Sequence, residues 1–155
     1  MTIIAQPLLD PTPIGLYNFG IGYLDTARAA EASGIKIPFG DPKEFLVAHS
    51  LELIFKADLR RSLTMDQIKR DYGHNLSKLR KRVSKEFAGH FHLDTEFDNL
   101  VLYLSEGHSG PNWRNRYLVT GYRAAILPAP ELIRIMVRFT TNDRKWLLAH
   151  FITSA

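Results

Sequence analysis

Apolar side chains recur at spacings of three and four residues along most of the chain, a pattern that is typical of amphipathic helices. Polar or helix-breaking residues separate the apolar stretches. The pattern predicts helices over residues 14–33, 41–63, 64–73, 75–89 and 94–107, and a last helix that begins at residue 129. It leaves open whether this last helix continues through the polar residues 140–142 or whether a separate terminal helix starts there.

Residues that favour helix ends stand at the predicted boundaries. Asp41 and Pro42 suit the N-cap and the first position of the second helix, because proline loses no intrahelical hydrogen bond there. The segment Thr64-Met65-Asp66-Gln67 is similar to a capping box, and Asn75 suits an N-cap. In the first helix, Gly20 and its neighbouring glycines make sense if another helix packs closely.

Mostly helical segments with short connections predict an all-α fold, a bundle of four or five helices. The second predicted helix is apolar on several sides, so we expect it to lie at the centre. Three prolines in residues 1–13 indicate an extended N-terminal arm, and residues 14–155 are expected to form one helical-bundle domain. Within residues 112–127, apolar and polar side chains alternate as in a strand over only a few positions, which predicts an irregular or short hairpin arm.

The composition narrows the classes of protein. The chain has 155 residues, is 45% hydrophobic and contains no cysteine, which excludes a disulfide framework, thiolate metal ligands and a cysteine nucleophile. The first seven residues lack the pattern of a secretory signal, and no apolar stretch approaches the ~20 residues that span a bilayer. We therefore expect a cytoplasmic protein with no membrane partner.

The formal net charge of +4 is unevenly distributed. Residues 41–89 carry eleven basic and seven acidic side chains, whereas residues 90–113 carry four acidic and no basic ones. The densest basic patch favours phosphate contacts with a nucleic acid, although a solvated helix face would have the same composition. Its members are Lys78, Arg80, Lys81, Arg82 and Lys85.

A second candidate for nucleic-acid contact is the segment Trp113-Arg114-Asn115-Arg116-Tyr117, in which aromatic and guanidinium groups alternate. Arg116 could contact phosphate and Tyr117 could stack on a base. The alternative is a loop whose aromatic side chains plug the bundle.

The second helix carries one polar stripe. His49, Glu52 and Lys56 are three and four residues apart, so they share a face. They could form an exposed ion-pair ladder, or they could line a cleft between helices, where buried charges must be paired. His74 stands between a helix that ends on Gly73 and one that begins on Asn75, which suits a general base, a phosphate contact or a residue that fixes the turn.

The segment from Ala48 to Leu59, followed by Tyr72-Gly73-His74-Asn75-Leu76-Ser77-Lys78-Leu79, resembles the HEPN family of small helical bundles, found in prokaryotic toxin, phage-defence and nucleotide-handling proteins. The resemblance implies a helical bundle, frequent dimerisation and action on RNA or nucleotides. It also implies that any cleavage would be by a metal-independent ribonuclease.

HEPN ribonucleases carry an arginine with a histidine after four to six intervening residues. Arg144 and His150 have that spacing, whereas three residues separate Arg70 from His74. The candidate catalytic residues are therefore His74, Arg144 and His150, with a nuclease-inactive relative as the other interpretation.

No cofactor is expected, and no metal site. His90-Phe91-His92-Leu93-Asp94 has ligand-type residues, but no strand is predicted to align them and Asp94 suits an N-cap. The expected partners are RNA or a nucleotide, together with a second copy of the chain or a partner protein. The alternative function is a non-catalytic interaction or immunity-type scaffold, in which His49, Glu52, Lys56 and His74 would be structural.

Overall fold

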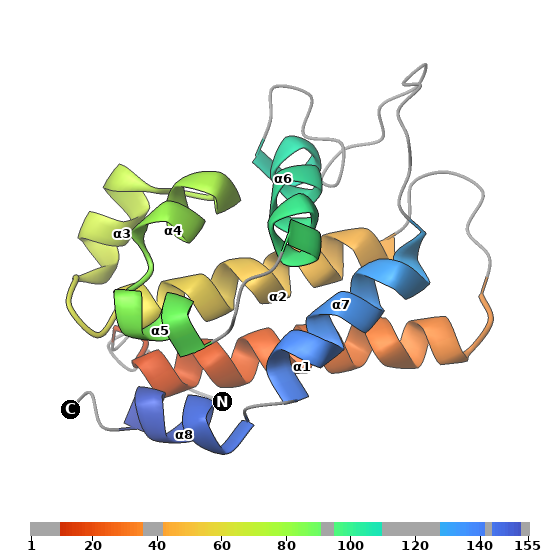
Figure 1. Cartoon of the computed structure of the whole chain (residues 1–155), viewed down its shortest axis with the longest axis horizontal. Helices are drawn as coiled ribbons and strands as arrows, with labels where there is room; N and C mark the ends of the chain where they lie inside the picture. Colours follow the sequence, from red (N-terminus) through yellow and green to blue (C-terminus); the bar gives the residue numbers. More distant parts are fainter. Residues whose placement is uncertain (1–9, 36–41, 91–94, 110–127, 142–143, 153–155) are drawn as a thin grey trace, which may run out of the picture.

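A computed structural model describes residues 10–35, 42–90, 95–109, 128–141 and 144–152 (Figure 1). These residues form eight helices and no strand, which confirms the predicted all-α class. The helices are α1 (Pro13–Ala32), α2 (Pro42–Leu59), α3 (Met65–Asp71), α4 (Leu76–Arg82), α5 (Lys85–His90), α6 (Thr95–Ser109), α7 (Ala129–Thr141) and α8 (Arg144–Ile152). The predicted arm at residues 112–127, and the predicted N-caps Asp41 and Asp94, lie outside the described residues.

Helices α1 and α2 form a long antiparallel pair on which the rest of the bundle is assembled (Figure 1). Gly20 lies at a close contact between them, because a Cβ atom there would stand 3.0 Å from the carbonyl oxygen of Ser50 and from Cγ1 of Ile54. Helix α2 also contacts α4, α6 and α7, so it occupies the predicted central position. Helix α8 packs against α1 and α7.

The hydrophobic core is built from apolar side chains of all eight described helices. Phe55 of α2, Phe87 of α5 and Phe151 of α8 are fully buried in the same core, so three segments that are distant in sequence contribute to it. The predicted inner stripe of α6, Phe97, Leu100, Val101 and Leu104, is buried as expected. No helix in the described ranges is long and apolar enough to cross a bilayer.

One predicted helix is shorter than expected, and another is divided. The second predicted helix ends at Leu59, and Thr64 then caps α3 with the predicted capping box. The helix predicted over residues 75–89 breaks at Ser84, whose backbone N donates to Oδ2 of Asp58 at 2.6 Å and whose Oγ accepts from N of Phe87 at 3.1 Å. Ser84 therefore starts α5 as its N-cap.

The last predicted helix is present as two helices, since α7 ends at Thr141 and α8 begins at Arg144. Together these divisions raise the number of helical segments among the described residues to eight, three of which have only six or seven residues.

Candidate functional site

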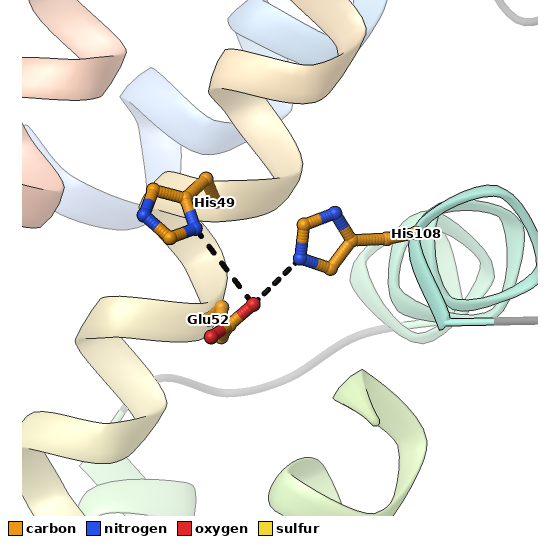
Figure 2. A group of neighbouring side chains, drawn as sticks. All are labelled: His49, Glu52 and His108. Carbon is orange, nitrogen blue, oxygen red and sulfur yellow. Dashed lines mark hydrogen bonds and ion pairs between the residues drawn. The ribbon is translucent and has the colours of Figure 1, made fainter. Parts of the chain in front are cut away.

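A buried carboxylate, Glu52 of α2, is the centre of a polar cluster inside the bundle. Its side chain is 1% exposed. Oε1 accepts from Nζ of Lys56 at 2.6 Å, and Oε2 accepts from Nε2 of His108 at 2.6 Å. Nδ1 of His74 lies 2.9 Å from Oε1 and 3.1 Å from Oε2. Figure 2 shows His49 and His108 on either side of Glu52, both directed at the same carboxylate oxygen. The carboxylate is thus surrounded by nitrogen atoms.

Three separate parts of the chain deliver these side chains. His49, Glu52 and Lys56 lie on one face of α2 because their spacings of three and four match the helical repeat. His74 follows Gly73, whose φ of 54° turns the chain between α3 and α4. His108 lies in the last turn of α6.

His49 lies in an aromatic setting and has no hydrogen bond at its inner nitrogen. The ring stacks on Phe45, with ring centroids 5.7 Å apart, and the edge contact with Tyr23 has a centroid distance of 4.6 Å. Nδ1 of His49 is 3.8 Å from Oε2 of Glu52, too far for a hydrogen bond. Within the described residues, this buried nitrogen and Nδ1 of His108 have no hydrogen-bond partner.

The surrounding groups keep Glu52 ionised. Burial by itself would raise the pKa of Glu52, but the hydrogen bonds from His108 and Lys56, the neighbouring imidazole of His49 and the charge of Lys56 outweigh it and hold that pKa far below its usual range. A buried carboxylate is stable only when it is paired in this way. The cluster is therefore a charged site within an apolar core.

The structure brings together all four residues of the predicted polar cluster, His49, Glu52, Lys56 and His74, in the interhelical arrangement rather than as an exposed ladder. Sequence reasoning missed His108, because the glycine before it was interpreted as the end of the helix. His108 follows Leu104 by four residues and so continues the inner stripe of α6, which is the signal that could have found it.

A second buried pair joins α2 to α8. Nε2 of His150 lies 2.8 Å from Oδ1 of Asp58, and both side chains are 1% exposed. Nη1 of Arg61 lies 2.9 Å from the same nitrogen. A nitrogen that donates to Asp58 cannot also accept from Arg61, so these two contacts are alternatives.

Arg144 and His150, the residues with ribonuclease-like spacing, do not face the same way. Six positions along a helix correspond to directions about 120° apart. Arg144 is exposed, whereas His150 points inward to Asp58. The described contacts do not bring the two side chains together.

Next to the second pair is a cavity of about 260 Å³. It is lined by Asp58, Leu59, Arg61, Ser62, Arg82 and Ser84. Both oxygens of Asp58 accept from Ser84, Oδ1 from its hydroxyl group at 2.9 Å and Oδ2 from its backbone N at 2.6 Å. The cavity therefore combines two guanidinium groups with one carboxylate that is already hydrogen-bonded.

The predicted basic patch is divided between two helices. Lys78, Lys81 and Arg82 are exposed on α4, and Lys85 is exposed on α5. Arg80 is half-buried and pairs with Asp98 of α6 at 3.2 Å. The two other predicted nucleic-acid contacts, Arg116 and Tyr117, lie outside the described residues, as do the side chains of His90, His92 and Asp94.

Comparisons with known proteins give no relative: no family model, curated protein or solved structure matches the chain.

Proposed function

We propose that this chain is a HEPN-like domain that binds the phosphates of RNA or of a nucleotide through α4. The observation that carries the proposal is the row of exposed cations Lys78, Lys81 and Arg82. Lys81 and Arg82 stand three and four positions after Lys78, so all three lie along one side of the helix. No described carboxylate forms an ion pair with any of the three, so their charges are available to a ligand.

The cavity beside α4 supports the same proposal. Arg82 belongs both to the row of cations and to the cavity lining, where Arg61 is the second guanidinium. Guanidinium groups bind phosphate oxygens with paired hydrogen bonds, which a lysine cannot do. An RNA strand bound along the cations of α4 would thus place a phosphate at the cavity mouth.

The proposal assigns binding and no cleavage step to this face. His150 is directed at Asp58, Arg144 is directed elsewhere, and His74 is hydrogen-bonded to Glu52. The resemblance to HEPN proteins favours a cytoplasmic toxin or phage-defence role, with a second copy of the chain or a partner protein. A nuclease-inactive member of that group fits these residues best.

The test is fluorescence anisotropy with a labelled single-stranded RNA of about 20 nucleotides. The variant Lys78→Gln/Lys81→Gln/Arg82→Gln should weaken binding at least about tenfold at low salt, because phosphate neutralisation supplies most of the affinity. A control with the same loss of charge, Arg28→Gln/Arg138→Gln/Lys145→Gln, changes exposed cations of α1, α7 and α8. It should bind within about threefold of the wild type.

Equal losses in both triple variants would mean that net charge, not α4, attracts RNA. No binding by the wild-type chain would overturn the proposal and favour the interaction scaffold, in which the Glu52 cluster only stabilises the fold.

A further inference from the structure

We propose that His49, Glu52 and His108 form a binding site for a divalent transition-metal ion of the zinc class. One potential ligand atom from each residue lies within 4.8 Å of those of the other two (Figure 2). Two imidazoles and a carboxylate are a ligand set that zinc uses where three protein groups bind it and a fourth position stays open. The proposal is independent of the RNA-binding face.

The separations between the ligand atoms suit such an ion. In a tetrahedral zinc site with bonds of about 2.0–2.1 Å, neighbouring ligand atoms are about 3.3 Å apart. Oε2 of Glu52 is 2.6 Å from Nε2 of His108 and 3.8 Å from Nδ1 of His49, so the observed values lie on both sides of that distance. Side-chain rotations that move Nε2 of His108 away from Oε2 and bring Nδ1 of His49 closer to it would therefore form the site without a change in the helices.

The inner nitrogen of His49 supplies the second observation. Nδ1 is buried, is directed at Glu52 and has no hydrogen-bond partner within the described residues. Leaving such a group unsatisfied costs about 1–3 kcal/mol. Coordination of an ion by the nitrogen lone pair would remove that cost, which explains why a histidine stands here between Phe45 and Tyr23.

Hydrogen bonds from Lys56 and His74 orient the carboxylate of Glu52. Oε1 accepts from Nζ of Lys56 at 2.6 Å, and Nδ1 of His74 lies 2.9 Å from Oε1 and 3.1 Å from Oε2. Hydrogen bonds of this kind orient the carboxylates that bind metals, and an ion would replace the hydrogen bond between Oε2 and His108. The ammonium group of Lys56 opposes a divalent cation, so the affinity must come from the two imidazoles. That condition favours zinc and its neighbours over calcium and magnesium, which require several oxygen ligands.

The test is metal binding by the full chain after treatment with a chelator, followed by competition with a chromophoric zinc chelator and by the visible spectrum of bound Co²⁺. The wild type should bind one Zn²⁺ per chain in preference to Mg²⁺ and Ca²⁺. Changes of residues around metal ligands already cost 10–100-fold in affinity, so His49→Ala should weaken zinc binding at least about 100-fold. It should also abolish the Co²⁺ bands.

His49→Ala carries the test because the side chain of His49 makes no hydrogen bond in the described residues, so the helical circular dichroism spectrum should be unchanged. Variants of Glu52 would also release Lys56 and His74. The control His90→Ala/His92→Ala removes the two histidines of the segment His90-Phe91-His92-Leu93-Asp94, and it should bind zinc like the wild type.

Three results would overturn the proposal: no stoichiometric zinc in the wild type, affinity within about threefold of wild type in His49→Ala, or loss of zinc in the His90→Ala/His92→Ala control alone.

Discussion

Oε2 of Glu52 accepts a 2.6 Å hydrogen bond from Nε2 of His108, although 56 residues separate the two in sequence. The bond joins the middle of α2 to the last turn of α6, and His74 joins the turn before α4 to the same carboxylate. One buried acid thereby fixes the relative positions of three parts of the bundle. Its stability depends on the basic groups around it.

The first prediction concerns this dependence. Glu52→Gln should lower the free energy of unfolding by about 3–5 kcal/mol, because it leaves Lys56 buried without its carboxylate. Glu52→Gln/Lys56→Met should recover part of the loss, since both members of the pair are then uncharged. Urea denaturation of metal-free protein measures both variants, and a single variant as stable as the wild type would contradict the account.

Two glycines of α1 provide a matched pair. Gly20→Ala should destabilise the protein by about 1 kcal/mol or more, because the added Cβ meets backbone and side chain of α2 at 3.0 Å. At Gly22 no atom outside the local helix lies within 4 Å, so Gly22→Ala should stabilise the protein by about 0.5–1 kcal/mol through helix propensity. Thermal unfolding should show opposite shifts, and shifts of the same sign would contradict the α1–α2 packing.

The break between α4 and α5 predicts an order of effects. Ser84→Ala should cost about 1 kcal/mol, because the N-cap oxygen is lost while the backbone N of Ser84 remains bonded to Asp58. Asp58→Ala should cost more, about 3 kcal/mol, since it also removes the partner of buried His150. Chemical denaturation should rank the two variants in this order, and the reverse order would show that Asp58 does not hold this junction.

The stability of the protein is expected to depend on pH in the alkaline range because Tyr17 is buried. Burial raises the pKa of Tyr17 above its usual value of 10.0, and the charge of Arg144 only partly offsets this. Because the folded-state pKa is raised, the contribution of Tyr17 to stability is complete below pH 10.0 and is lost as the pH rises through the folded-state value. The stability of the wild type relative to Tyr17→Phe should therefore fall above pH 10.0 and stay constant below it. A difference that does not change at alkaline pH would contradict the burial of this hydroxyl.

The elements of the fold were largely predictable because apolar spacing and caps are local signals. Thr64 and Asn75 cap α3 and α4 as their sequence contexts predict. The break at Ser84 was not predictable in this way, because the carboxylate that holds it, Asp58, is 26 residues away. A serine inside an apolar repeat has the same local sequence whether or not such a partner exists.

The candidate site was also predictable where its signals are local in the sequence. His49, Glu52 and Lys56 follow from the helical repeat alone, and His74 from its place between two helix signals. The burial of Glu52 and Lys56 depends on α6 and α4 covering α2, which is a tertiary property. His108 lies on α6, and it meets Glu52 only because α6 packs against α2.

The most direct test of the proposed phosphate-binding face is the salt dependence of RNA binding, measured as the slope of the logarithm of the association constant against the logarithm of salt concentration. Each phosphate contact with a single strand contributes about 0.7 to the magnitude of that slope. If Lys78, Lys81 and Arg82 contact phosphates, the Lys78→Gln/Lys81→Gln/Arg82→Gln variant should have a slope smaller by about 2, whereas the Arg28→Gln/Arg138→Gln/Lys145→Gln control should keep the wild-type slope. Equal slopes for the wild type and the α4 variant would contradict the account.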